Sequence, residues 1–179
     1  KGAKFTVGTI KRAERRRLPA PPFTTSNLQQ EASRKLGFST QKTMQIAQQL
    51  YEGVELAGEG SQGLVTYIRT DSTRIADEAV EAVRALILDN WGGDYLPEKP
   101  NVYKTRKSAQ DAHEAIRPTV VERRPEAIKA SLSRDQFRLY KLIYDRFVSS
   151  QMTPALYDTL AVDIDSRSGV RFHFNGQKQ

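Results

Sequence analysis

Cysteine is absent from this chain of 179 residues, and histidine occurs only twice, as His113 and His173. The lack of cysteine excludes disulfide bonds and thiolate metal sites, and two histidines are too few for a histidine-only zinc site. No apolar run approaches the roughly 20 residues of a membrane-spanning helix, and no signal peptide is visible. We therefore expect a soluble, cytoplasmic protein without membrane contacts. Because the chain begins with Lys1 rather than methionine, we also expect it to be a fragment of a longer parent protein.

Acidic residues are scarce at the N-terminus. Within residues 1–17, seven Lys and Arg side chains accompany a single acidic side chain, Glu14, so this basic arm carries +6 of the net charge of +7. Such an arm suits the phosphate backbone of a nucleic acid, where each contact releases counterions. A solvated surface strand or loop has the same composition, and both interpretations stay open.

Hydrophobic periodicity predicts strands at both ends of the chain and helices between them. Alternating apolar residues predict a strand at 4–10, and a hairpin of 160–164 and 170–174 that turns at Ser168-Gly169. Periodic apolar residues predict longer helices at 26–36, 40–52, 75–90 and 134–150, and shorter helices at 109–116 and from Pro125 onward.

Local signals set the expected ends of these helices. Ser26 and Ser133 each stand three residues before a glutamine, which is the spacing of a capping box. One of the three polar residues at 71–73 is expected to cap the helix at 75–90. The segment 53–63 contains four glycines and is expected to be a flexible loop.

This order of elements predicts an α+β fold of more than one domain. A mainly helical domain at 23–154 is expected to be inserted into a β domain. The β domain is represented by two partial segments, 1–22 with the basic arm and 155–179 with the hairpin. The boundary falls at 19–22, Pro-Ala-Pro-Pro, because proline is excluded from helix interiors and central strands.

The segment 63–73, Gly-Leu-Val-Thr-Tyr-Ile-Arg-Thr-Asp-Ser-Thr, places an arginine two residues after a tyrosine. In a strand, Tyr67 and Arg69 share one face, because side chains alternate with period two. An ordinary phenol has a pKa of about 10, so ionising it fully near pH 7 means offsetting roughly 4 kcal/mol. A nearby guanidinium favours the phenolate and neutralises an attacked phosphate. The pair therefore suits a tyrosine nucleophile acting on a phosphate ester, although a packing tyrosine beside a surface arginine has the same spacing.

A second polar segment, 110–119, contains His113 among acidic side chains, with Arg117 four residues later. A histidine in this setting can hydrogen-bond a phosphate oxygen or hold a proton near neutral pH. The alternative is an exposed histidine at the end of a short helix. His173 alternates within the predicted C-terminal strand, and we interpret it as structural.

Four blocks of the sequence together resemble the type IA DNA topoisomerases, most closely the bacterial enzyme, with reverse gyrase as a close relative. Two of the blocks are the segments 63–73 and 110–119. The others are Pro-Phe-Thr-Thr-Ser-Asn-Leu-Gln-Gln at 22–30 and Gln-Met-Thr-Pro-Ala at 151–155. The blocks occur in the order in which the family has them, so the resemblance is far more specific than any single motif.

The resemblance implies an isomerase that cleaves one DNA strand through a 5′-phosphotyrosine intermediate. Tyr67 stands where the family has its nucleophile, Arg69 matches an arginine on the scissile phosphate, and His113 matches a histidine that places DNA for cleavage. We add Arg117 to Arg69 and His113 as a candidate DNA-binding residue. The family passes a strand through the break and religates it, which relaxes negative supercoils without a nucleotide cofactor. The implied partner is DNA, single-stranded at the cleavage site, and the implied location is the nucleoid.

Parts of the family's machinery are missing from this sequence. The resemblance implies Mg²⁺ as a cofactor, held by acidic residues of a separate N-terminal Toprim domain, and we assign no metal ligand to this chain. A further DNA-binding domain of the family is also missing. We therefore expect the fragment alone to be inactive in relaxation. Residues 53–62 are longer than the family's usual link into the tyrosine segment.

Other classes of protein fit parts of the pattern. Tyrosine recombinases also attack DNA phosphates, but they need a His-x-x-Arg pair before the nucleophile. Here His113 and Arg117 are four residues apart and both follow Tyr67. A non-catalytic DNA-binding module that uses the basic arm and the helices is a second alternative, and a purely structural or protein-interaction role is a third.

Overall fold

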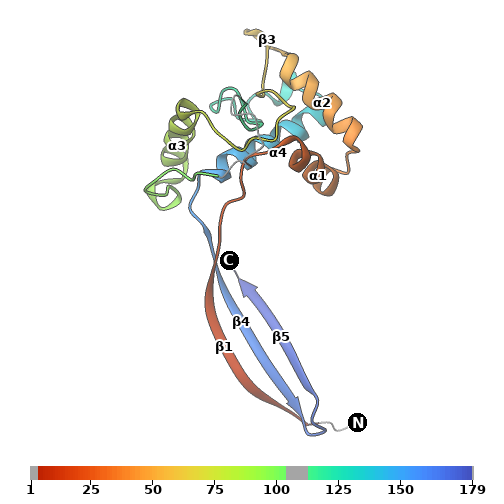
Figure 1. The fold of residues 1–179 in the computed structure, drawn as a ribbon, viewed down its shortest axis with the longest axis vertical. Helices are drawn as coiled ribbons and strands as arrows, with labels where there is room; N and C mark the ends of the chain where they lie inside the picture. The colour runs from red at the N-terminus through yellow and green to blue at the C-terminus, as the bar shows by residue number, and fades with distance from the viewer. Residues whose placement is uncertain (1–3, 104–112, 179) are drawn as a thin grey trace. The chain divides into compact units, whose positions relative to one another are not determined.

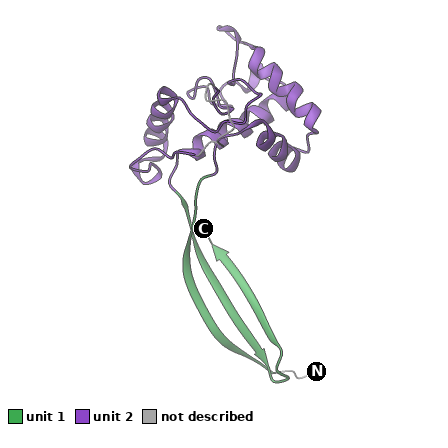
Figure 2. Cartoon of the chain, in the orientation of Figure 1, with its two compact units in different colours: residues 1–19, 154–179 green, residues 20–153 purple. Residues whose placement is uncertain are grey.

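The computed structural model describes residues 4–103 and 113–178 of the chain. These residues form helices and antiparallel sheets, which confirms the predicted α+β fold. The chain divides into two compact units, shown in Figure 2. Unit 1 consists of residues 1–19 and 154–179, and unit 2 consists of residues 20–153.

Unit 1 is a three-stranded antiparallel sheet with the strand order β1-β4-β5 (Figure 1). Its strands are β1 (Phe5–Arg17), β4 (Ala155–Ser166) and β5 (Arg171–Lys178). The predicted hairpin is confirmed, with Gly169 in the left-handed region at a φ of 82°. Strand β1 is much longer than the predicted 4–10, because main-chain pairing with β4 continues as far as Arg17 opposite Ala155. The basic arm is therefore a strand at the edge of this sheet.

Unit 2 contains four α-helices within the described residues, all close to their predicted positions. They are α1 (Thr25–Leu36), α2 (Thr40–Glu52), α3 (Asp77–Trp91) and α4 (Arg134–Ser150). Two short 3₁₀ helices, η1 (Gly93–Tyr95) and η2 (Lys129–Ser131), lie in the connections. No helix among the described residues is both long and apolar enough to cross a membrane.

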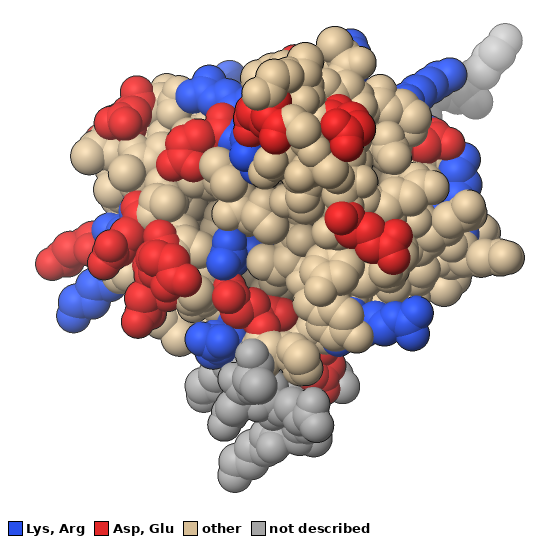
Figure 3. Space-filling model, turned by 90° about the horizontal axis from the view of Figure 1, so that it is seen from above, with Lys and Arg blue, Asp and Glu red and all other residues tan. Residues whose placement is uncertain are grey.

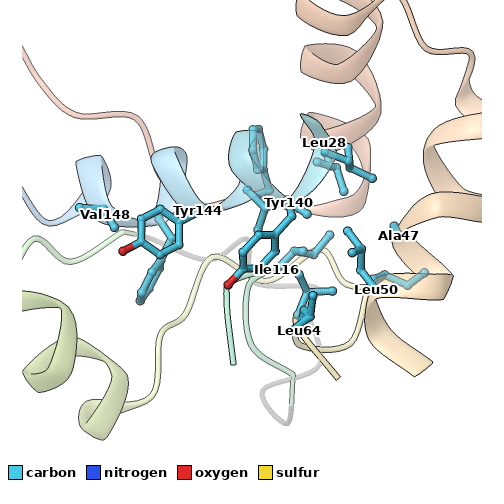
Figure 4. Close-up of a cluster of buried hydrophobic side chains, with 14 of the residues drawn as sticks. Leu28, Ala47, Leu50, Leu64, Ile116, Tyr140, Tyr144 and Val148 are labelled. Carbon is cyan, nitrogen blue, oxygen red and sulfur yellow. The ribbon is translucent and has the colours of Figure 1, made fainter. Parts of the chain in front are cut away.

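The core of unit 2 forms around α4. Figure 4 shows Tyr140 of α4 beside Ile116 of a connecting segment, with Leu28 of α1 and Leu50 of α2 on one side of it and Tyr144 of α4 on the other. Burial raises the pKa of both phenols, and each hydroxyl donates a 2.8 Å hydrogen bond to a main-chain carbonyl oxygen. These tyrosines are structural, because each satisfies its polar end inside the core.

The caps of the helices agree only in part with the sequence signals. The capping box at the start of α4, between Ser133 and Gln136, is confirmed. The predicted box at Ser26 is wrong, because Thr24 caps α1 and its hydroxyl accepts from the N–H of Asn27 at 3.4 Å. The capping residue lies two positions before the predicted Ser26, so α1 begins earlier, at Thr25.

The start of α3 has no side-chain cap, so the predicted cap within residues 71–73 is wrong. Ser72 lies too far upstream, where its hydroxyl accepts the N–H of Arg74 at 3.1 Å. Helix α3 begins instead at Asp77, and the acidic side chains in its first turn interact favourably with the helix dipole.

Three further connections differ from their predictions. The expected loop at 53–63 contains a small hairpin of β2 (Val54–Leu56) and β3 (Gly60–Gln62). The chain after Pro125 forms turns and η2 rather than an α-helix. Of the helix predicted at 109–116, residues 109–112 lie outside the described residues. The remaining four residues are not helical, because their main chain bonds to distant segments, with Ile116 opposite Phe23.

Candidate active site

Tyr67 and Arg69 lie on an irregular segment and not on the predicted strand. Val65 forms an isolated antiparallel bridge with Pro118, and the chain then bends away from any sheet. Exposure nevertheless alternates, because Tyr67 and Arg69 are exposed whereas Ile68 between them is buried. The tyrosine is 40% exposed. Both side chains therefore reach solvent. The backbone between them is held by long-range hydrogen bonds.

Thr66 anchors this segment on the side before Tyr67. Its N–H donates to the carbonyl oxygen of Arg117 at 2.9 Å. Its hydroxyl donates to the carbonyl oxygen of Ala115 at 2.8 Å and accepts the N–H of Arg117 at 3.0 Å. These three bonds join the tyrosine segment to the second predicted segment.

Thr25 anchors the segment on the side after Tyr67. The Thr25 N–H donates to the carbonyl oxygen of Thr70, and the Thr70 N–H donates to the Thr25 hydroxyl, both at 2.9 Å. The same hydroxyl donates to the carbonyl oxygen of Ile68 at 2.7 Å. Tyr67 and Arg69 thus lie between two threonine anchors that hold the main chain on either side of them.

The end of α2 is attached to the same segment. The N–H of Leu64 donates to the carbonyl oxygen of Leu50 at 2.7 Å, and the Thr119 hydroxyl donates to the carbonyl oxygen of Gly63 at 2.7 Å. A Cβ atom on Gly63 would lie 2.9 Å from the carbonyl oxygen of Tyr51, so only glycine allows this approach. The attachment brings Tyr51 beside Tyr67.

Three rings meet at the surface of unit 2. The ring centroids of Tyr67 and His113 are 5.5 Å apart with the planes at 35°, and those of Tyr67 and Tyr51 are 5.6 Å apart with the planes at 66°. The structure therefore brings together two of the predicted site residues, Tyr67 and His113, and adds Tyr51. The apolar periodicity of α2 predicts Tyr51 on its buried face, but its side chain is 39% exposed.

Arg69, two residues after Tyr67, is exposed. Its guanidinium forms no hydrogen bond or ion pair with any residue that the structure describes. A guanidinium without a protein partner has its N–H donors available to bind a phosphate through two parallel hydrogen bonds.

Arg117 differs from Arg69 in its exposure to solvent. Its side chain is buried, with 8% of the residue exposed. Its Nε donates to Glu114 Oε2 at 2.8 Å, and its Nη1 donates to the carbonyl oxygen of Pro118 at 2.9 Å. The same Glu114 oxygen accepts the N–H of Ala76, next to the first residue of α3, at 3.1 Å. Arg117 therefore links the His113 segment to the start of α3 through Glu114.

The pKa of Glu114 reflects this network. Burial on its own raises the pKa of the carboxyl group, but the hydrogen bonds from Arg117 and Ala76 and the nearby positive charges outweigh burial. The pKa is therefore lowered below its ordinary value of 4.5, and Glu114 is ionised at neutral pH.

The described residues do not form a metal site. No three His, Asp or Glu side chains among them gather closely enough to hold an ion. Asp163 and Asp165 of β4 have Asp-x-Asp spacing, but Asp163 contacts His173 and Asp165 pairs with Arg171, both at 2.7 Å. A Mg²⁺ ion does not fit these described carboxylates, so we derive no chemical step through one.

Charge on the face of the molecule in Figure 3 is mixed. Acidic and basic side chains are interspersed over the visible, described part of this face instead of forming one basic surface. Over this face, attraction of a phosphate therefore depends on individual exposed cations, because charges of opposite sign nearby weaken the longer-range field.

The sequence assigned no role to three further residues at the site. Thr25 forms its bonds across 43 and 45 residues, Tyr51 looks like a core residue of an amphipathic helix, and Glu114 looks like one charge among several. Thr25 and Glu114 lie within the blocks 22–30 and 110–119 that carry the family resemblance, whereas Tyr51 lies outside all four blocks.

Comparison with known proteins now defines the class. A family model described as DNA topoisomerase matches residues 1–179, so the chain belongs to this family. Among its relatives, the chain is 54% identical over 162 residues to DNA topoisomerase 1 of Xylella fastidiosa, in both strain Temecula1 and strain 9a5c. These findings confirm the predicted family, the bacterial type IA DNA topoisomerases.

These matches cover most of this chain but only a small share of the matched proteins. The alignment to the two Xylella proteins covers 90% of this chain but only 20% of theirs. The structure of full-length topoisomerase I from Thermotoga maritima matches with a TM-score of 0.83 and 43% sequence identity. That match covers 98% of this chain and 28% of the Thermotoga chain. This chain therefore spans only a minor part of the proteins that it resembles.

Proposed function

We propose that this chain is the part of a type IA DNA topoisomerase that carries the nucleophile, and that Tyr67 is that nucleophile. The observation that carries the proposal is the placement of Tyr67. Its ring is exposed and lies 5.5 Å from the ring of His113, and the adjacent main chain is held on both sides by Thr66 and Thr25. The phenol is therefore presented to solvent from a backbone that is held on both sides.

The reaction is a transfer of one phosphoester bond. The Tyr67 oxygen attacks a phosphorus atom of one DNA strand, a new oxygen–phosphorus bond forms, and the bond to the 3′ oxygen breaks. The phenol loses its proton and the departing 3′ oxygen gains one, so a 5′-phosphotyrosine and a free 3′-hydroxyl result. The 3′-hydroxyl reverses the reaction after strand passage. No nucleotide is consumed, because the energy of the phosphodiester is kept in the covalent bond.

Arg69 and His113 have separate tasks in this proposal. Arg69 binds the attacked phosphate through its free guanidinium and stabilises the charge that develops there, as preorganised donors do. His113 lies beside the Tyr67 ring, where it positions the DNA strand. We propose that Arg117 acts through the structure, because its guanidinium is buried against Glu114 and Pro118.

The remaining parts of the activity are expected outside this chain. The family resemblance implies Mg²⁺, whose charge would assist phosphate chemistry, with ligands in another domain of the parent. Strand passage and relaxation of negative supercoils also need those domains. The relatives at 54% identity bear the name DNA topoisomerase 1, which favours a plain topoisomerase over a reverse gyrase as the parent.

A second candidate function is a non-catalytic DNA-binding module. The basic strand β1 favours it, because a strand edge that bears several arginines suits a phosphate backbone. The two functions are compatible in one parent protein, and covalent capture of DNA separates them.

The test is covalent capture of a single-stranded oligonucleotide by the full-length parent. The expected result is a denaturant-resistant complex linked to the 5′ phosphate, which Tyr67→Phe abolishes and Tyr95→Phe leaves unchanged. Tyr95 is a suitable control because it is also exposed, at 51%, and lies in η1 of the same unit. A 5′-linked complex that persists in Tyr67→Phe would contradict the proposal, and a 3′ linkage would indicate recombinase-like chemistry.

A further inference from the structure

Tyr51 differs from the core tyrosines of unit 2. The hydroxyl groups of Tyr140 and Tyr144 each donate to a main-chain carbonyl oxygen at 2.8 Å. The Tyr51 hydroxyl forms no hydrogen bond within the described part of the chain, and the side chain is 39% exposed. Tyr51 therefore leaves both its polar end and part of its ring accessible, as Tyr67 does.

The fold fixes the place of Tyr51 relative to Tyr67. The carbonyl oxygen of Leu50, one residue before Tyr51, accepts the N–H of Leu64 at 2.7 Å. The close approach at Gly63 holds the main chain of Tyr51 against the same segment. The contact between the two rings therefore follows from main-chain bonding, and not from side-chain rotation alone.

The ring geometry leaves room for a ligand. Tyr51 and Tyr67 meet edge to face, at 66°, and such a contact uses one face of only one of the two rings. The His113 ring also contacts the Tyr67 ring, with 5.5 Å between the ring centroids. Among the described residues, no ring contact joins His113 to Tyr51. The exposed part of the Tyr51 ring is therefore available for a planar group beside Tyr67.

We propose that Tyr51 is a base-binding residue, and that its ring stacks on a base of the DNA strand next to the phosphate that Tyr67 attacks. This inference rests on the proposed function of Tyr67. A strand whose phosphate lies at the Tyr67 hydroxyl brings an adjacent base near a ring centred 5.6 Å from that of Tyr67. Stacking of bases on aromatic side chains is how proteins hold single strands without reading their sequence.

A stacking role and a packing role predict different results for substitutions at Tyr51. If Tyr51 only supports the Tyr67 ring, its replacement changes the rate of cleavage but not the environment of any base. If Tyr51 stacks on a base, an aromatic replacement keeps that environment and an aliphatic one removes it. The series Tyr51, Tyr51→Phe and Tyr51→Leu separates the two roles.

The experiment uses the full-length parent with Tyr67→Phe, so that DNA binds without being cleaved. Single-stranded oligonucleotides carry the fluorescent base 2-aminopurine at successive positions around the cleavage site. We expect quenching at one position with Tyr51 and with Tyr51→Phe, and its loss with Tyr51→Leu. The affinity for the oligonucleotide is expected to fall by about 5- to 150-fold in Tyr51→Leu, as for the loss of one stacked base.

Tyr95→Leu in η1 is the matched control, and we expect it to change neither quenching nor affinity. Equal quenching in the Tyr51 and Tyr51→Leu proteins overturns the inference. Failure of the parent with Tyr67 intact to capture DNA covalently overturns the proposed function instead. Because the binding assay uses a protein that cannot cleave, the two failures are read from separate measurements.

Discussion

A reciprocal pair of hydrogen bonds, each 2.9 Å long, joins Thr25 and Thr70, in addition to a bond from the Thr25 hydroxyl to the carbonyl oxygen of Thr70 at 3.0 Å. The main-chain N–H of Thr25 donates to the carbonyl oxygen of Thr70, and the N–H of Thr70 donates to the hydroxyl of Thr25. That hydroxyl also donates to the carbonyl oxygen of Ile68. The first residue of α1 therefore shapes the backbone on both sides of Arg69, in a segment that no sheet supports.

Thr25→Val is expected to damage both stability and cleavage. Valine has the shape of threonine but leaves the N–H of Thr70 and the carbonyl oxygen of Ile68 without this partner, at a cost of about 1–3 kcal/mol. We expect that loss in denaturant unfolding of this chain, and slower covalent capture of DNA by the parent. Thr25→Ser should restore most of both, because serine keeps the hydroxyl.

The control for Thr25 is Thr40→Val. Thr40 is the first residue of α2, as Thr25 is of α1, but its side chain is exposed. We expect a change of less than about 0.5 kcal/mol there. A Thr25→Val protein that captures DNA at the normal rate would show that the anchor has no part in the reaction.

Arg69→Ala is expected to slow covalent capture about 100-fold or more, in the range found when a single transition-state donor is removed. Arg69→Lys should recover only part of the rate, because an ammonium group cannot bind phosphate through two parallel bonds. The measurement is single-turnover cleavage of an end-labelled oligonucleotide. Arg34→Lys on the exposed surface of α1 is the control, and equal rates for Arg69 and Arg69→Lys would argue against a bidentate contact.

The stability of unit 2 is expected to fall in acid, partly through Glu114. Its pKa is lower in the folded chain than the ordinary 4.5, so it stabilises the fold above that value. The contribution disappears as the pH falls through the lowered pKa. Glu114→Gln should therefore be less stable than the original chain at pH 7, and its unfolding free energy should depend less on pH below about 5.

Denaturant unfolding at a series of pH values measures this difference. Glu126→Gln serves as the comparison, because Glu126 also has a lowered pKa, chiefly from its hydrogen bond with Lys141, but its side chain is 63% exposed. Screening by solvent makes such an exposed pair contribute little. Parallel pH curves for Glu114→Gln and the original chain would rule out the assigned network.

The basic strand β1 is expected to contribute to DNA binding through Arg15 and Arg17. These two residues lie on one face of the strand, whereas Arg16 has Glu14 within 3.6 Å. Replacing both with glutamine should reduce the slope of log affinity against log salt by about 0.7 for each phosphate of the single strand that the protein no longer neutralises. A salt titration that gives the same slope for both proteins would favour a solvated strand that does not touch DNA.

The isolated chain is expected not to relax a negatively supercoiled plasmid, even with Mg²⁺ present. Its described residues form no metal-binding cluster, and it spans only 20% of its Xylella relatives. Gel electrophoresis of the plasmid after incubation is the measurement, with the full-length parent as the positive control. Efficient relaxation by the isolated chain would show that the site is complete without further domains.

Local signals predicted the helices well and the connections poorly. Apolar stripes place α1, α2 and α4, the closing glycines end α1 and α2, and the capping box starts α4, since these signals act within a few residues. The segment at Tyr67 looks like a strand because its apolar residues alternate. It has no partner strand beyond Val65. Its main chain bonds instead to the carbonyl oxygen of Arg117 through the N–H of Thr66, and to the Thr25 hydroxyl through Ile68 and Thr70.

The sequence by itself determined the α+β class, the main helices and the family. Each of these depends on residue types and short spacings. Only the tertiary structure decided that Tyr51 and His113 flank Tyr67 and that Arg117 is buried against Glu114. The bonds that arrange the site join residues about 45 to 50 positions apart, so they form only when these distant segments have come together.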